Sequence, residues 1–121
     1  MFFDTAKLAH PLGESGEAVP AVDLGEMGTH AAEAAAFLKA LSHEGRLMIL
    51  VHLAFGEKTV TELERLLSSR QAAVSQQLTR LRLEGLVRAR REGKSIHYSI
   101  SDTKVLSMVR LVDELFCAPV H

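Results

Sequence analysis

Residues 70–100 read RQAAVSQQLTRLRLEGLVRARREGKSIHYSI, and this stretch carries most of the information about the fold of the 121-residue chain. In its first part, apolar residues recur at helical spacing until Gly85, which predicts a helix over residues 71–84. In its second part, apolar and polar residues alternate on both sides of Glu92-Gly93, which predicts two strands joined by a tight turn. The stretch is therefore expected to form one helix followed by a β-hairpin.

Three more helices are predicted before this stretch. Apolar residues at helical spacing indicate a first helix from His30 to about Ser42 and a second from about Glu44 to Phe55. Thr61-Glu62-Leu63-Glu64 has the pattern of a capping box, in which the threonine and glutamate side chains each accept a hydrogen bond from a free backbone amide. A third helix should therefore begin there and continue to about Leu67, and residues 68–70 should form a turn into the next helix.

A fifth helix is predicted after the hairpin, over residues 103–117, and Pro119 ends it. Two short helices joined by a three-residue turn and followed by a hairpin make a winged helix-turn-helix. The expected fold is mainly α with a β-hairpin wing, in the order α-α-α-α-β-β-α. Residues 28–118 should form this DNA-binding and dimerisation domain, and residues 1–27, which are acidic and contain five Gly and Pro residues, should be a flexible tail.

The apolar residues of the fifth helix cover more of its circumference than packing on one side requires. A domain this short also has a small core, so contact with a second copy of the chain would add to the buried apolar surface. We therefore expect a homodimer in which this helix takes part in a two-fold interface. The apolar residues concerned are Val105, Met108, Val109, Val112, Leu115 and Phe116.

Several classes of protein and site find no support in the sequence. No apolar run reaches the roughly 18 residues that a membrane-spanning helix needs, and the N-terminus lacks a signal-peptide pattern, so a cytoplasmic protein with no membrane partner is expected. Cys117 is the single cysteine, which excludes an intrachain disulfide and a multi-thiolate metal site. Because no Gly-rich phosphate loop or nucleophile elbow is found, neither enzyme activity nor a cofactor is expected.

Charge is distributed unevenly along the chain. The whole chain carries a net charge of −1. Residues 58–98, however, contain nine basic and four acidic side chains, a local charge of +5, and the remainder carries −6. A separation of this kind attracts a polyanion to one face of a protein. The predicted helix-turn-helix and hairpin lie within the positive segment, so they are the expected nucleic-acid contact.

The helix over residues 71–84 has two distinct sides. At about 100° per residue, Val74, Leu78 and Leu81 fall on one side and should pack inward. The opposite side carries small and polar residues that can enter a major groove, where Gln can bond bidentately to adenine and Ser or Thr can contact bases or phosphates. The basic side chains of the hairpin can reach phosphates nearby. The expected DNA contacts are Gln71, Ser75, Gln76, Thr79 and Arg80 from the helix and Arg90, Arg91 and Lys94 from the hairpin.

Residues 70–100 and three further segments resemble the ArsR/SmtB family of dimeric winged-helix repressors. The three segments are LSHEGRLMIL, TVTELERLL and LVDELFC. The resemblance covers His30 to Cys117 and points to the branch of the family that senses reactive sulfur species and oxidants. It implies a sequence-specific repressor that binds double-stranded operator DNA as a homodimer. It also implies that the first and last helices build the dimer interface, and that Gln71, Ser75, Gln76 and Thr79 approach the operator.

The same resemblance implies a redox sensor made of two cysteines, with reactive sulfur species or oxidants as effectors. Cys117 matches the second cysteine, at the end of the last helix. Val51 stands at the position of the first, in the run Ile49-Leu50-Val51-His52-Leu53. Valine can pack like cysteine but cannot form a disulfide or polysulfide bridge. The sensor is therefore expected to be incomplete in this chain.

Two other functions remain open from the sequence. One is a metal-responsive repressor of the same family that uses scattered histidines and carboxylates, although no ligand set with tetrahedral spacing is visible and no metal site is expected. The other is a winged-helix module that acts through protein contacts and has no operator. The residues concerned in the first case are His43, His52, His97, Asp113 and Glu114.

Overall fold

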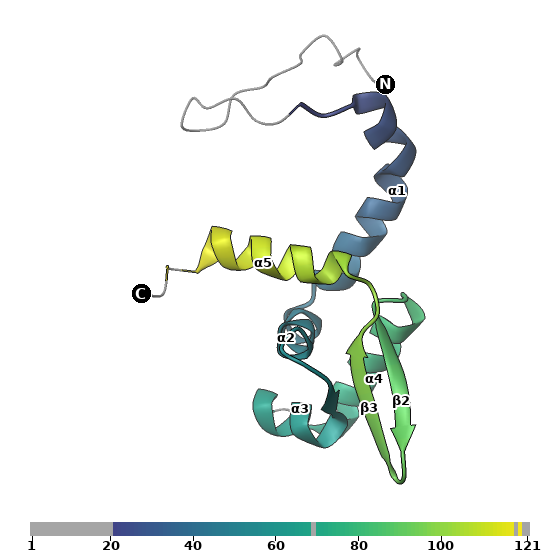
Figure 1. Cartoon of the computed structure of the whole chain (residues 1–121), viewed down its shortest axis with the longest axis vertical. Coiled ribbons are helices and arrows are strands. Elements are labelled where there is room, and N and C mark those ends of the chain that lie inside the picture. The colour runs from purple at the N-terminus through teal and green to yellow at the C-terminus, as the bar shows by residue number, and fades with distance from the viewer. Residues whose placement is uncertain (1–20, 69, 118, 120–121) are drawn as a thin grey trace. The chain divides into compact units, whose positions relative to one another are not determined.

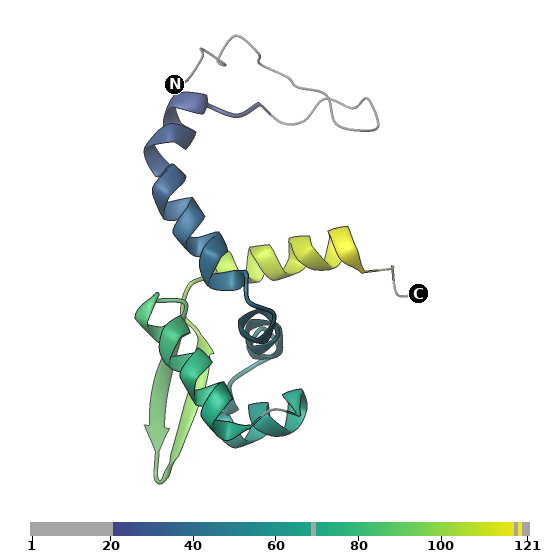
Figure 2. The ribbon, with the colours of Figure 1, turned by 180° about the vertical axis from the view of Figure 1, so that it is seen from behind.

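The structure, a computed structural model that describes residues 21–68, 70–117 and 119, is a winged helix-turn-helix with five helices and a small antiparallel sheet (Figure 1; seen from behind in Figure 2). The elements are α1 (Leu24–Leu41), α2 (Glu44–Leu53), β1 (Lys58–Thr59), α3 (Val60–Leu67), α4 (Gln71–Leu83), β2 (Val87–Glu92), β3 (Ser95–Ile100) and α5 (Lys104–Phe116). Their order confirms the predicted fold, with the short strand β1 added before α3. The chain divides into two units, residues 1–37 and residues 38–121, and the helix-turn-helix and the wing belong to the second.

α1 begins at Leu24, earlier than the predicted start at His30. Asp23 caps this end, because its Oδ1 atom accepts a hydrogen bond from the Glu26 amide at 3.0 Å. Residues 25–29 are all exposed, so the helix needs no apolar side before His30 and apolar spacing gave no sign of this part. The predicted tail over residues 1–27 otherwise lies mostly in residues 1–20, which are outside the described part of the chain.

α3 begins earlier than its predicted capping box implies. The prediction that Thr61 and Glu64 form this box is wrong, because the box consists of Thr59 and Glu62. Thr59 Oγ1 accepts a hydrogen bond from the Glu62 amide at 3.2 Å, and the Glu62 carboxylate accepts one from the Thr59 amide at 2.9 Å. The pairs Thr59/Glu62 and Thr61/Glu64 both fit the sequence pattern of a capping box. Thr59, however, lies in β1 opposite His97 and so has the extended backbone that a cap requires. Strand pairing therefore sets the start of α3.

The sheet has three strands in the order β1-β3-β2, and both pairings are antiparallel. In the β2–β3 hairpin, Ala89 lies opposite Tyr98 and Arg90 lies opposite His97. Gly93 has a φ of +61° at the first position of the two-residue turn, a conformation that glycine adopts at little cost and that type II′ hairpins require there. The two long strands of this hairpin form the wing, which the sequence predicted. β1, with only two residues, was too short to leave an alternating pattern.

The core of residues 38–121 lies between the helices of this unit and the base of the wing. α4 packs against α2, α3 and β2, so one of its sides is covered along its length. Full burial of one Leu, Ile or Val side chain contributes roughly 1.5–3 kcal/mol to folding. α4 is therefore held firmly on its apolar side. The large side chains less than 2% exposed are Ile49, Leu50, Leu63, Leu78 and Leu81, with Val74 and Val105 equally buried.

Candidate nucleic-acid interface

The turn between α3 and α4 joins the two helices in a helix-turn-helix arrangement. Ser68 ends α3 with a left-handed backbone (φ 52°, ψ 41°), and its amide donates a hydrogen bond to the Glu64 carbonyl. Arg70 then has an extended backbone (φ −68°, ψ 143°) and immediately precedes α4. Ser69, which the sequence also placed in this turn, lies outside the described residues. The short reversal brings α3 and α4 into contact.

α4 has one buried and one exposed side, as the sequence predicted. On the exposed side lie Gln76, Thr79 and Arg80, and Ser75 beside them is half-buried. Gln71 is the first residue of the helix, but its side chain lies outside the described part of the structure. The structure thus brings four of the five predicted helix contacts to one region of α4. The inward residues are Val74, Leu78 and Leu81.

The exposed residues of α4 differ in how far their polar groups are already occupied. The Thr79 hydroxyl donates to the Ser75 carbonyl at 3.0 Å, a bond within the helix. Arg80 forms an ion pair with Glu84 at 3.4 Å, and because both side chains are exposed this pair contributes little to stability. No partner for the Gln76 amide is found among the described residues. Gln76 is therefore the residue best able to offer a free donor and acceptor to a base edge.

Arg46, on α2, fixes α4 and was not singled out by the sequence. Its Nε atom donates to the Ala40 carbonyl at 2.6 Å, and one terminal nitrogen donates to the Lys39 carbonyl at 3.2 Å. The other terminal nitrogen donates to Oε1 of Gln77 on α4 at 3.3 Å. The guanidinium thus satisfies carbonyls at the end of α1 and ties them to the helix that would read DNA. An arginine within a mainly apolar helix was the one local sign of this role.

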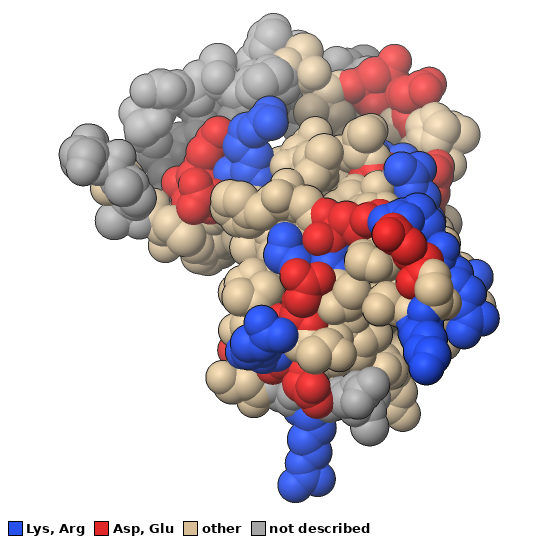
Figure 3. Space-filling view, turned by 60° about the horizontal axis from the view of Figure 1, so that its bottom comes forward, with Lys and Arg blue, Asp and Glu red and all other residues tan. Residues whose placement is uncertain are grey.

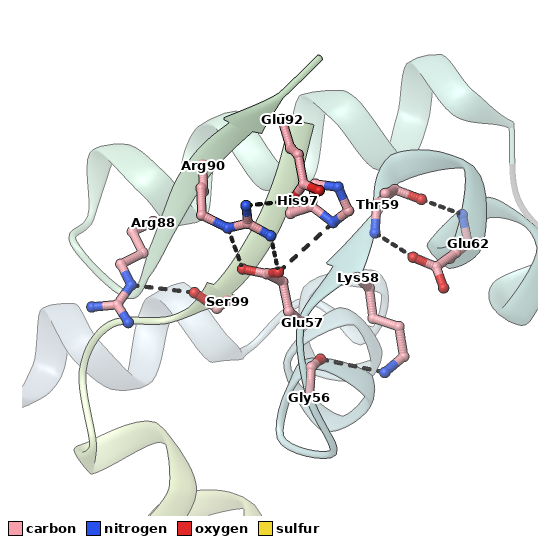
Figure 4. Close-up of polar contacts among 10 residues, drawn as sticks. All are labelled: Gly56, Glu57, Lys58, Thr59, Glu62, Arg88, Arg90, Glu92, His97 and Ser99. Atoms are coloured by element: carbon pink, nitrogen blue, oxygen red, sulfur yellow. Dashed lines mark hydrogen bonds and ion pairs between the residues drawn. The ribbon is translucent and has the colours of Figure 1, made fainter. Parts of the chain in front are cut away.

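The wing carries an ionic cluster on one face of the sheet (Figure 4). The Arg90 guanidinium makes two hydrogen bonds to the Glu57 carboxylate, at 2.6 Å and 3.2 Å, and a third to Glu92 at 2.6 Å. Glu57 precedes β1, so its side chain reaches across β3 to meet Arg90 on β2. His97 Nδ1 lies 3.8 Å from the same Glu57 carboxylate. The sequence predicted Arg90 as a DNA contact, and the structure places its guanidinium between two carboxylates.

The other basic residues of the wing are placed differently. Arg88 Nε donates to Ser99 Oγ across the hairpin at 3.3 Å. Arg91 and Lys94 are exposed at the tip, and no ion pair for either is found in residues 21–68 and 70–117. The sequence named both as phosphate contacts, which remains a prediction that their position supports. The tip and Arg88, whose partner is a neutral hydroxyl, therefore carry positive charge without an ion pair in the described residues.

Electrostatic effects in the cluster follow from its hydrogen bonds. The bonds from Arg90 hold the pKa of Glu57 and that of Glu92 below the usual value for glutamate, and the two carboxylates raise the pKa of Arg90. All three groups are therefore charged at neutral pH. Figure 3 shows basic and acidic side chains lying close together toward the bottom of the view. The local net charge of +5 was counted over residues 58–98, so it did not include Glu57.

Cys117 and Val51 are the two positions where the sequence suggested a sensor. Cys117 follows the last residue of α5 and is exposed. A hydrogen bond with the Asp113 side chain, followed by burial, raises the pKa of the Cys117 thiol. Little thiolate is then present at neutral pH, and the thiolate is the reactive form. Val51 lies half-buried in α2, which packs against α5, and offers no thiol to bridge.

Candidate metal ligands are not gathered in the described part of the chain. Within it, no group of three or more His, Cys, Asp or Glu side chains is placed to hold a metal ion. His43 instead caps α2, because its Nδ1 atom accepts a hydrogen bond from the Gly45 amide at 3.0 Å. The metal-responsive alternative therefore finds little support.

Comparison with known proteins adds to this geometry. Residues 43–89 match the family model described as "Bacterial regulatory protein, arsR family". The biofilm growth-associated repressor of Agrobacterium fabrum is 43% identical over 81% of this chain and 88% of its own length, and the transcriptional activator HlyU of Vibrio cholerae is 41% identical over 79% and 89%. The crystal structure of the repressor BigR from Xylella fastidiosa superposes with a TM-score of 0.78 at 39% identity, over 81% of this chain and all of that one.

Proposed function

The chain belongs to the ArsR family of bacterial regulatory proteins, as a winged-helix transcriptional regulator of the BigR and HlyU type, and we propose that it represses transcription by binding operator DNA as a homodimer. The observation that carries this proposal is the exposed polar side of α4, whose opposite side is buried in the core. The wing tip adds basic side chains for which no ion pair is found in the described residues. This is the arrangement that a helix needs to enter a major groove.

The dimensions of α4 fit this role. Its 13 residues give a length of roughly 20 Å at about 1.5 Å per residue, and the major groove is about 12 Å wide. Gln76 would read a base edge, and Ser75, Thr79 and Arg80 would contact bases or phosphates beside it. Gln71, at the first turn, would be the remaining helix contact. Arg91 and Lys94 would contact the DNA backbone from the wing tip.

Dimerisation is supported by the apolar surface of α5. Val105 is fully buried, but Leu111, Leu115 and Phe116 are 44%, 66% and 80% exposed. Exposed apolar side chains at this density along a helix are unfavourable in water and indicate a partner surface. In a two-fold dimer these residues would be covered, and two copies of α4 would be presented to two half-sites.

The response to reactive sulfur species or oxidants is proposed to be incomplete. A bridge between α2 and the end of α5 would change how these helices pack, but Val51 cannot supply one of its two sulfur atoms. Cys117 can still be oxidised or persulfidated on its own. We therefore propose that the ancestral switch is uncoupled from DNA binding. Such a regulator would act in the cytoplasm, and in the described residues no helix is long and apolar enough to cross a membrane.

Binding to duplex DNA under varied salt tests this function. A repressor should prefer its operator over a random duplex, and its affinity should fall with salt at a slope of about −0.9 in log units per phosphate contact. The operator can be selected from a random duplex library with the purified full chain. If no duplex is preferred over random sequence, the chain acts through protein contacts and the repressor proposal fails. Loss of operator binding on addition of zinc alone would favour the metal-responsive alternative.

A further inference from the structure

In the ionic cluster of the wing, Arg90 is bonded to carboxylates, although an arginine on a DNA-binding surface is expected to be available to phosphates. Arg90 directs three N–H groups at carboxylates, two at Glu57 in a forked arrangement and one at Glu92. Forked arginine–carboxylate pairs are the strongest form of this interaction. The two carboxylates come from different elements, the loop before β1 and the end of β2, so Arg90 is held from both sides.

The charges of the cluster do not cancel. One guanidinium and two carboxylates carry a net charge of −1 between them, and the Arg88 guanidinium also acts on Glu57 from the base of the hairpin. A phosphate that approaches Arg90 must therefore displace a carboxylate to gain a direct contact. The Arg90 side chain is itself half exposed, so its lack of free charge results from pairing and not from burial.

Arg91 and Lys94 provide the contrast on the same hairpin. Arg91 directly follows Arg90, and Lys94 directly follows the turn residue Gly93. No acidic partner for either is found among the described residues. Arg88, at the base of the hairpin, has only the neutral Ser99 hydroxyl as a partner in the described residues, so Arg90 is the wing arginine that carboxylates hold. β2, which carries Arg88, Arg90 and Arg91, packs against α4.

We propose that Glu57 and Glu92 keep Arg90 away from DNA phosphates and so lower the general affinity of the wing for DNA. This inference rests on the proposed DNA-binding function and is set against the prediction that Arg90 itself contacts DNA. Phosphate contacts strengthen binding to every sequence, whereas base contacts from α4 distinguish the operator. A phosphate contact from Arg90 would raise the affinity for operator and random duplex alike, so the two carboxylates lower the general affinity of the wing for DNA and leave the choice of sequence to α4.

The decisive variant is Glu57→Gln combined with Glu92→Gln. Glutamine keeps the shape of each side chain and removes the charges that hold Arg90. If Arg90 then reaches a phosphate, the salt slope for random duplex becomes steeper by ~0.9 per protomer. For a dimer, the gain in random-duplex affinity between 200 mM and 50 mM salt exceeds that of the wild type by about tenfold. The ratio of operator affinity to random-duplex affinity should stay that of the wild type, because the added contact is available on every sequence.

Three controls separate this effect from a general change in charge. Adding Arg90→Gln to the double variant should remove the steeper slope, since no arginine is freed. Glu64→Gln, on α3, removes an acidic side chain for which no ion pair is found in the described residues, so its slope should stay that of the wild type. Lys94→Gln should make the slope shallower by ~0.9 per protomer. Thermal unfolding of each variant checks that the fold is kept.

The possible results are distinct. A wild-type chain without salt-dependent duplex binding refutes the proposed function and this inference together. Wild-type binding with an unchanged slope in the double variant refutes the inference alone, as does weaker binding, which would make Glu57 a residue that positions the wing. A steeper slope that survives Arg90→Gln also refutes it, because freed arginine would not be the cause.

Discussion

Replacement of Arg46 by Met tests whether one side chain fastens α4 to the rest of the domain. Methionine keeps most of the apolar stem and removes the guanidinium with its three hydrogen bonds, at 2.6, 3.2 and 3.3 Å. A hydrogen bond from a charged group contributes about 1.5–3 kcal/mol when well formed, and the two longer bonds here contribute less. Because the site is only partly buried, we expect the free energy of unfolding to fall by about 2–3 kcal/mol.

Urea unfolding measures this change directly. For a small domain an m-value of about 2 kcal/mol per molar urea converts the loss into a midpoint lower by roughly 1 M. All samples need the same protein concentration, since the stability of a dimer depends on it. Gln77→Ala should remove the bond at 3.3 Å alone and lower the unfolding free energy by about 0.5–1.5 kcal/mol. The double variant should lose less than the sum of the two, because the partners interact.

Arg82→Met on α4 is the matched control, because Arg82 is exposed and no side-chain partner for it is found among the described residues. Its unfolding free energy should stay within about 0.5 kcal/mol of the wild type. Arg46→Met with the midpoint of the wild type would show that the three contacts do not stabilise the fold. An equal loss in Arg82→Met would show that the effect is one of overall charge and not of position.

Four further predictions concern DNA binding, assembly, the sensor and pH. Gln76→Ala should lower operator affinity by about 1–3 kcal/mol and relax the preference at one base position, which binding to single-base operator variants measures; uniform weakening on all sequences would contradict a base contact. Leu111→Glu should yield monomers in sedimentation and weaken operator binding strongly; a wild-type chain that is already monomeric at micromolar concentration contradicts the dimer. Polysulfide should leave wild-type operator affinity within about twofold, whereas Val51→Cys should form a bridge to Cys117 that mass spectrometry detects and should release DNA with a coupling of about 1–3 kcal/mol; release by the wild type refutes this. Because the pKa of Glu57 is lowered from 4.5 in the folded chain, its contribution to stability is present above that pH and is lost as pH falls through the lowered value, so the difference in unfolding free energy between wild type and Glu57→Gln should shrink from pH 6 to pH 3.

The sequence predicted the helices and the hairpin well where apolar residues repeat at a regular spacing. α4 ends one residue before the predicted limit, and the inward position of Leu78 followed from counting 100° per residue. It predicted poorly where no apolar side is needed, as in the exposed first turns of α1. β1 was missed because two residues cannot show alternation. The capping box was misplaced because two overlapping pairs fit one pattern.

The sequence predicted where the candidate site lies, but it did not predict how the charged side chains of the site are paired. The exposed side of α4 and the basic tip of the wing lie where the sequence put them, and their contacts with DNA remain predictions. Arg90 shows the limit of counting charge along the chain. Its partner Glu57 is 33 residues away, outside the segment that was counted, and only the sheet brings the two together.

The sequence by itself determined the order of the elements and the buried side of α4, because these follow from interactions between residues a few positions apart. Helical spacing, caps and turn glycines act within that range. Only the tertiary structure showed the hydrogen bond from Arg46 to Gln77, 31 residues apart, and the pairing of Arg90 with Glu57. Such contacts depend on how helices and strands pack, and no local pattern encodes them. The charge available to DNA therefore follows from packing, whereas the fold that presents it follows from local periodicity.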